Sequence, residues 1–142
     1  MIKTTYDDIW ECFYDNCGVD YNTLPSTDEG KYILIKNGCR KYNTVIDPQE
    51  NKIKCDDFLE EINLELDDNR LMLLAYCIRY NFLENDLIRY EQVWQNFAKD
   101  IGQKFYGDQV KGREATLERT KNEIDKLLLN IESYSYLEWL YE

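Results

Sequence analysis

The chain contains no histidine. Histidine is the commonest general base in enzymes and the commonest side-chain ligand of metals, so its absence removes the usual basis of both kinds of site. A cysteine nucleophile would also lack its usual imidazole partner. We therefore expect no catalytic residues, no metal site and no cofactor, and we predict that the protein is not an enzyme.

Glycine and proline are scarce, with 6 and 2 copies among 142 residues. All-β folds rich in turns need many of both, so this scarcity favours helices. Apolar and aromatic residues make up 44% of the chain, which argues against a disordered protein. The length is that of one domain. We predict a single, mostly α-helical domain.

The sequence lacks any apolar run long enough for a signal sequence or a membrane span, and it begins with the polar segment MIKTTYDDIW. It also lacks a CxxC pair, and its cysteines are odd in number, which does not indicate a disulfide framework. We expect reduced and mostly buried thiols at Cys12, Cys17, Cys39, Cys55 and Cys77. These absences together predict a cytosolic protein without a membrane partner.

Acidic residues outnumber basic ones, and the net charge is -11. The excess is uneven: residues 1–70 carry 16 acids and 8 bases, whereas residues 71–142 carry 12 and 9. Nucleic acids and anionic membranes are bound mainly through Lys and Arg, so both are disfavoured as partners. The negative charge suits a protein that binds a basic surface of another protein. It also suits a protein that lies beside DNA and repels it.

The N-terminal half shows several short elements. A helix is predicted over about 5–17, capped by Thr4 or Thr5 and stopped by Gly18. A second helix opens at Ser26, which has capping-box spacing to Glu29, although its segment KYILIK is also compatible with a strand. A turn is expected at 47–48. Residues 56–62 indicate a short helix or helical turn, and residues 63–66 alternate as a strand does.

The C-terminal half predicts two long helices. Residues 70–98 contain neither glycine nor proline, and their apolar residues recur at helical spacing. A bend is expected at 101–107, followed by a helix over 108–132 whose apolar residues recur every seven positions. Such helices form an antiparallel hairpin. The predicted fold is a helical bundle built on this hairpin, with shorter N-terminal helices and a possible small β element.

Two patterns resemble chemical sites only superficially. Asp56, Asp57, Glu60 and Glu61 would bring carboxylates together on one helical turn, but acids at the start of a helix usually face water. Gly107 and Gly112 have the spacing of a phosphate loop, yet Arg113 and Glu114 replace the required Lys-Ser/Thr. We interpret these glycines as positions that let the chain bend.

The end of the chain is rich in large apolar side chains. We divide the sequence into a helical domain over 1–132 and an aromatic tail over 133–142. The tail either folds back on its own helices or inserts into a neighbouring subunit, as aromatic anchors do at interfaces. Its candidate docking residues are Tyr134, Tyr136, Leu137, Trp139, Leu140 and Tyr141.

The stretch from Leu66 to Glu132 resembles proteins that are encoded with the virion structural genes of tailed bacteriophages. The similarity lies in the segment LDDNRLMLLAY, in the bend KDIGQKFYGDQ and in the helix GREATLERTKNEIDKL. The earlier segment LPSTDEGKYILIKNGCRKYN resembles the opening helix of head–tail adaptors, the head-completion proteins that form a connector ring under the portal. The similarity covers about two thirds of the chain and lies in pattern and order, without a diagnostic motif.

This resemblance implies a structural virion protein of the neck, assembled in the host cytoplasm. Its partners would be copies of itself in a ring, usually a dodecamer, together with the portal protein and the tail or neck proteins. A C-terminal extension would dock onto the portal, and the aromatic tail could serve as that anchor. The ring would extend the DNA channel, whose acidic lining would let DNA pass without specific binding.

An alternative function uses the same acidity differently. A mobile element could encode an acidic DNA mimic that inhibits a host defence nuclease. Such a mimic needs rows of carboxylates on one face, because duplex DNA carries about one charge per 1.7 Å of its axis. Here the acids are interleaved with core positions and with 17 basic residues.

Overall fold

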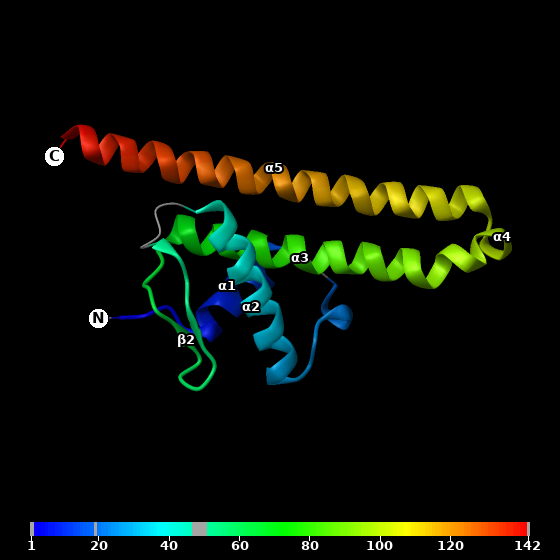
Figure 1. Ribbon diagram of the computed structural model, residues 1–142, viewed down its shortest axis with the longest axis horizontal. Coiled ribbons are helices and arrows are strands. Elements are labelled where there is room, and N and C mark those ends of the chain that lie inside the picture. The colour runs from blue at the N-terminus through cyan, green and yellow to red at the C-terminus, as the bar shows by residue number, and fades with distance from the viewer. Residues whose placement is uncertain (1, 19, 47–50, 142) are drawn as a thin grey trace.

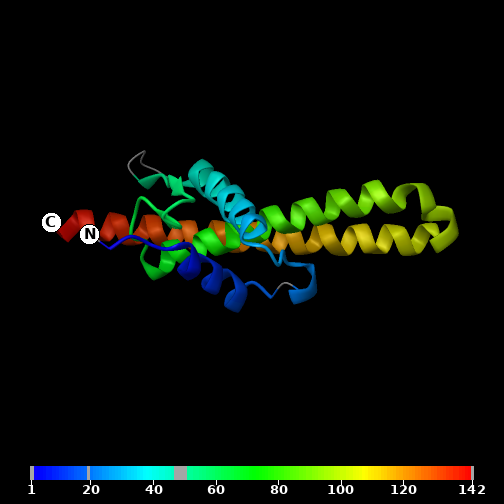
Figure 2. The ribbon, with the colours of Figure 1, turned by 90° about the horizontal axis from the view of Figure 1, so that it is seen from below.

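The computed structural model describes residues 2–18, 20–46 and 51–141, without the side chains of residues 133–139 and 141. Figures 1 and 2 show a long helical hairpin with a smaller body packed against one part of it. The hairpin consists of α3 (Asp68–Trp94) and α5 (Gln103–Tyr141), joined by a 3₁₀ turn (Gln95–Phe97) and by α4 (Ala98–Ile101). The prediction of a mostly helical fold built on a long antiparallel hairpin is confirmed.

The body begins with two helices, of which the first has nearly its predicted bounds. In α1 (Tyr6–Asn16), Thr5 and Asp8 form a reciprocal capping box. In α2 (Asp28–Val45), the cap is Thr27, whose side chain accepts a hydrogen bond from Gly30 N at 3.1 Å, and not the predicted Ser26. The segment that was compatible with a strand is therefore helical. A 3₁₀ turn (Tyr21–Thr23) lies between the two helices.

Residues 56–62 form a β-hairpin, so the prediction of a short helix there was wrong. The strands are β1 (Cys55–Asp56) and β2 (Glu61–Ile62), paired antiparallel. The N-terminal segment lies beside β2, because Ile62 N donates to Thr4 O at 3.0 Å and Thr4 N donates to Leu64 O at 3.0 Å. These distant partners outweigh the helical propensity of the acidic segment. The predicted turn at 47–48 lies outside the described residues.

The core is centred on the first part of α3, which α1, α2 and α5 surround. Most residues from 73 to 78 are buried, as expected for a helix covered on most of its circumference: Leu73, Leu74, Ala75, Cys77 and Ile78. The α2 helix crosses closely over α3 at Gly38, where Asn81 Nδ2 donates to Asn37 O at 2.7 Å. From α5 the core receives Thr120, Ile124 and Ile131.

Beyond this core the α3–α5 hairpin continues alone as an arm, which we define as residues 88–113. No residue from 79 to 119 is fully buried. The turn at the end of the arm is sharper than predicted, because Gly102 has a φ of 92° and α5 begins directly after it. Gly107 and Gly112 lie inside α5 and not in a linker. No helix in the described part of the chain is both long and apolar enough to span a membrane.

We predict opposite effects for two glycine substitutions. In Gly38→Ala, the new Cβ would lie 2.2 Å from Ile78 Cγ1, so the substitution should destabilise the protein by about 1–3 kcal/mol. In Gly112→Ala nothing lies within 4 Å, so the variant should gain about 0.5–1 kcal/mol from the lower entropy of the unfolded chain. Urea denaturation measures both values. Equal stabilities would contradict the close crossing of α2 and α3.

Candidate interaction surfaces

The register of the hairpin shows where the C-terminal helix loses its partner. Arg79 Nε donates to Thr120 Oγ1 at 3.3 Å, and Arg113 Nε lies 3.2 Å from Asp86 Oδ2, seven residues further along each helix in opposite directions. Continued toward the start of α3, this register places Asp68 opposite Ile131. Residues 132–141 therefore extend about 15 Å past the start of α3, at the helical rise of 1.5 Å per residue.

This C-terminal overhang, residues 132–141, contains all six predicted docking residues. Its backbone continues α5 to Tyr141, whereas the sequence predicted a helix that ends at 132. The side chains of Tyr134, Tyr136, Leu137, Trp139 and Tyr141 lie outside the described residues. Leu140 is described and is 51% exposed. The overhang begins where the contact between α3 and α5 ends, as Figure 1 shows at the C-terminus.

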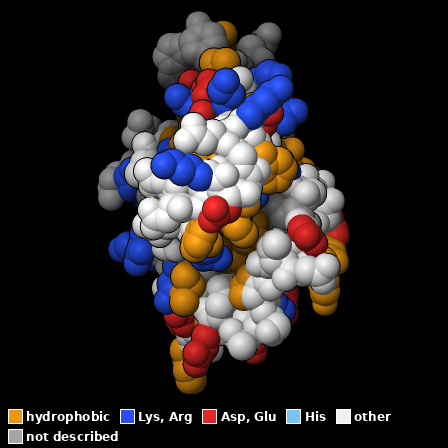
Figure 3. Space-filling model, turned by 90° about the vertical axis from the view of Figure 1, so that its right-hand side faces the viewer, with side chains coloured by type: hydrophobic (Ala, Val, Ile, Leu, Met, Phe, Trp, Pro, Cys, Tyr) orange, Lys and Arg blue, Asp and Glu red, His pale blue; other side chains and the backbone are white. Residues whose placement is uncertain are grey.

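The arm is a second apolar surface, which the sequence analysis did not identify. Its large side chains are about half exposed at Ile88, Val93, Trp94, Phe97 and Phe105. Figure 3 views the molecule from this end and shows hydrophobic side chains at the surface between charged ones. The sequence did carry a signal, because these residues do not all fit on one stripe of a two-helix hairpin, and some must face away from the partner helix.

Polar and aromatic contacts hold the arm together in place of a buried core. The rings of Tyr90 and Tyr106 stack with centroids 5.9 Å apart, and the Arg113 guanidinium lies 3.9 Å from the centroid of Tyr90. The arm also differs in charge from the rest of the chain. It carries five basic and three acidic residues, a net charge of +2, whereas the whole chain has -11.

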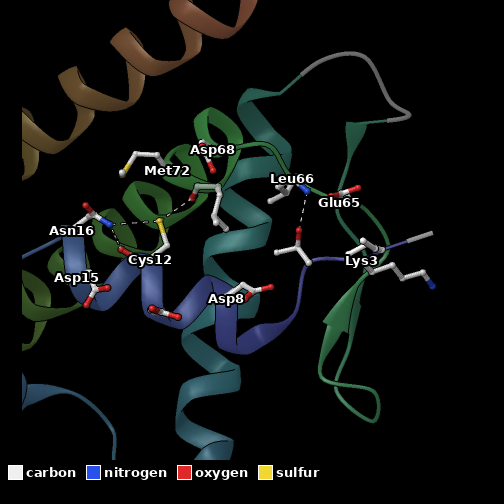
Figure 4. Close-up of a pocket in the computed structure, with 13 residues that line it drawn as sticks. Lys3, Asp8, Cys12, Asp15, Asn16, Glu65, Leu66, Asp68 and Met72 are labelled. Carbon is white, nitrogen blue, oxygen red and sulfur yellow. Dashed lines mark hydrogen bonds between the residues drawn. The ribbon is translucent and has the colours of Figure 1, made fainter.

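An acidic hollow of about 470 Å³ lies between the N-terminal segment, α1 and the start of α3 (Figure 4). Its lining includes one basic side chain, Lys3, and five carboxylates: Asp8, Glu11, Asp15, Glu65 and Asp68. Cys12 also lines it, and its Sγ contacts Leu71 O at 3.9 Å. Within the described residues, no group of three or more cysteines and carboxylates is arranged to hold a metal ion.

The carboxylates that the sequence grouped on one helical turn hold the β-hairpin in place. Asp57 accepts a hydrogen bond from the Tyr6 hydroxyl at 2.6 Å and pairs with Lys36 at 2.7 Å. The Lys36 ammonium and the Tyr6 hydroxyl lower the pKa of Asp57. Glu60 accepts a hydrogen bond from the Tyr32 hydroxyl. These acids therefore bind different groups of the body and do not converge on one point.

The pKa of Cys55 is lowered, whereas the pKa values of the buried thiols Cys17 and Cys77 are raised. Burial raises the pKa of Cys17 and of Cys77 to about 12, which keeps both thiols protonated. A hydrogen bond from the Cys39 thiol lowers the pKa of Cys55 to about 7, although burial of Cys55 opposes this effect. Only thiolates are strong nucleophiles, so Cys55 is the most reactive thiol that these shifts predict. The sequence analysis had treated all five cysteines alike.

We predict that iodoacetamide labels Cys55 first at neutral pH, and that the buried thiols react only after unfolding. The labelling rate should fall as the pH drops through about 7, because the thiolate is then protonated. Mass spectrometry of the labelled peptides measures both effects. Cys39→Ala removes the hydrogen bond and should slow labelling of Cys55 at pH 7. An unchanged rate in this variant would contradict the assigned cause.

These surfaces define an α-helical protein with a projecting arm and a C-terminal helical overhang. Comparison with known proteins indicates the family to which the chain belongs. The family model described as YomZ prophage protein matches residues 1–133. The SPbeta prophage-derived uncharacterized protein YomZ of Bacillus subtilis (strain 168) is 35% identical over 127 residues, which cover 89% of this chain and 95% of that relative. The chain therefore belongs to the YomZ prophage protein family.

No solved structure matches the chain. The family match confirms the bacteriophage origin that the sequence resemblance implied, at the level of a prophage-encoded protein. The matched residues include the body and the whole arm, whereas the candidate docking residues 134–141 lie beyond them.

Proposed function

We propose that this protein is a head–tail adaptor, a structural subunit that joins a phage capsid to its tail through contacts with other proteins. The observation that carries the proposal is the C-terminal overhang. A helix with six large apolar residues in eight positions extends past the end of its partner helix, where a neighbouring protein can bind it. The prophage family supports a role in a phage particle.

In this proposal the overhang docks onto the portal or a neck protein, and the bodies lie side by side in a ring. The ring extends the DNA channel, and its acidic surfaces line the channel so that DNA passes without sticking. The body supplies such a surface, because five carboxylates line the hollow beside α1. We propose no enzymatic step, no metal and no cofactor, and we expect the protein in the neck of the virion.

We predict that deletion of residues 133–142 leaves the fold intact and abolishes incorporation into particles. Among the residues whose side chains are described, the core cluster extends to Ile131, and the deletion begins two residues later. Circular dichroism and cooperative thermal unfolding test the fold. Mass spectrometry of purified particles, after prophage induction with the truncated gene, tests incorporation. Loss of cooperative unfolding would show that the overhang belongs to the core.

A pair of point variants separates docking from general surface effects. Leu140→Ser changes a half-exposed leucine in the overhang, whereas Leu129→Ser changes a leucine that is 62% exposed on the packed part of the same helix. We expect incorporation to fall with the first variant and to stay at the wild-type level with the second. Equal incorporation of both, together with normal incorporation of the truncated protein, would reject docking through the overhang.

The DNA-mimic alternative has one observation in its favour. Asp8, Glu11 and Asp15 line one hollow from a single face of α1, with the i, i+3 and i+7 spacing of a helical row. A tagged protein purified from induced cells distinguishes the two functions. Recovery of a portal or tail protein supports the adaptor. Recovery of a host nuclease, with a complex that weakens steeply as salt rises, supports the mimic.

A further inference from the structure

The turn of the β-hairpin presents two apolar side chains to solvent. Phe58 is 93% exposed and Leu59 is 57% exposed. Their backbone amides both donate to Asp56 Oδ1, at 3.0 and 3.1 Å, which closes the turn. We call these two residues the knob. It is small, and a single anchored aromatic buries about 150–250 Å² at an interface.

The knob is held rigidly, because the two acids that flank it, Asp57 and Glu60, bind the body. Asp57 binds Tyr6 and Lys36, and Glu60 binds Tyr32. Glu60 also has a φ of 53°, and its carbonyl accepts a hydrogen bond from Tyr6 N at 2.8 Å. A turn fixed in this way loses little conformational entropy when it binds.

A groove of about 460 Å³ lies on another face of α2, lined by the 23–25 loop, by α2 and by α3. Its apolar lining consists of Leu24, Pro25, Ile33, Leu34 and Phe82. The lining includes two charged residues, Asp86 and Arg89, and Asp86 is already paired with Arg113 at 3.2 Å. Arg89 therefore leaves the edge of the groove with a positive charge. Beside the knob, Asp57 and Glu61 are paired with Lys36 and Lys3, so the carboxylates of Asp56 and Glu60 leave its border negative.

The knob and the groove lie on opposite sides of α2. Tyr32 and Lys36, one helical turn apart, contact the hairpin, whereas Gly30 and Ile33 face the groove. Figures 1 and 2 both show the hairpin and the 23–25 loop on opposite sides of α2 along the long axis of the molecule. A groove and a knob so placed cannot meet within one chain, but they can meet between copies.

We propose that the knob of one copy binds in the groove of the next copy. The occupant of the groove is a second copy of this chain, because the same chain carries both an apolar projection with an acidic border and an apolar groove with a positive edge. Such a contact is head-to-tail, and repeated head-to-tail contacts close into a ring when the rotation between copies permits. The inference rests on the proposed ring and names the contact between its subunits.

Sedimentation of the full chain tests self-association. Because the knob is smaller than a standard interface of about 800 Å² per partner, we expect assembly only at concentrations from about 10 µM to about 1 mM. The average mass should rise above the 17.1 kDa of one chain over this range. Phe58→Ser should raise the concentration of half-assembly at least about tenfold. A wild-type protein that stays monomeric throughout would overturn the proposal.

A mixing experiment tests the head-to-tail geometry. Phe58→Ser removes the knob and keeps the groove, whereas Ile33→Glu adds a negative charge to the groove and keeps the knob. At the concentration where the wild type is half assembled, each variant alone should be mostly monomeric. An equimolar mixture should form dimers but no larger species, because only one competent contact remains per pair. Self-association of Ile33→Glu alone would overturn the assignment of the groove. Circular dichroism confirms that each variant is folded.

Phe105→Ser is the matched control, since Phe105 is 54% exposed on the arm, away from both surfaces. It should assemble as the wild type does, and a monomeric Phe105→Ser would assign the contact to the arm instead. The proposed function fails separately from this inference. If the wild-type protein is found in particles but is monomeric in solution, the contact between knob and groove is rejected and the adaptor function is not. If the protein self-associates but is not incorporated into particles, the adaptor function is rejected and the contact between knob and groove is not.

Discussion

The fold depends on the burial of the first part of α3, from Leu73 to Ile78. Residues 73–75, 77 and 78 are inaccessible to solvent, so most of the circumference of this helix is covered. Each large side chain buried there contributes about 1.5–3 kcal/mol relative to exposure. Three neighbours are needed for that cover, and α1, α2 and α5 supply them. The β-hairpin and the N-terminal segment complete the body, because Thr4 hydrogen-bonds with Ile62, Leu64 and Leu66.

The arm and the overhang protrude because the helices that pack together in the body differ in length. The arm begins where α1 and α2 no longer reach α3, and the overhang begins where α3 itself ends. Both parts belong to the two long helices, and both contain large apolar residues. Arg113 and Tyr90 keep the arm ordered with few buried groups. This protein of the YomZ prophage family thus combines a packed body with an arm and an overhang that extend beyond it.

The acidic residues have two different structural roles. Those of the β-hairpin turn are bound by Lys36, Tyr6 and Tyr32, so their charge stabilises a local shape. Those of α1 face an open hollow, where their charge repels phosphates and attracts cations. The arm is weakly basic and separate from both groups. The molecule therefore has surfaces of opposite sign, although the net charge of the chain is negative. Such surfaces can attract each other between copies.

The sequence by itself determined the long hairpin, the mostly helical fold and the extent of α1, because helical periodicity, capping residues and scarce glycine act locally. It also predicted the candidate residues of the overhang from their unusual density. Only the tertiary structure decided that residues 56–62 are a hairpin, since their partners Thr4 and Tyr6 are distant in the sequence. Likewise, the exposed knob, the lowered pKa of Cys55 and the register that leaves residues 132–141 beyond α3 depend on which groups meet in space.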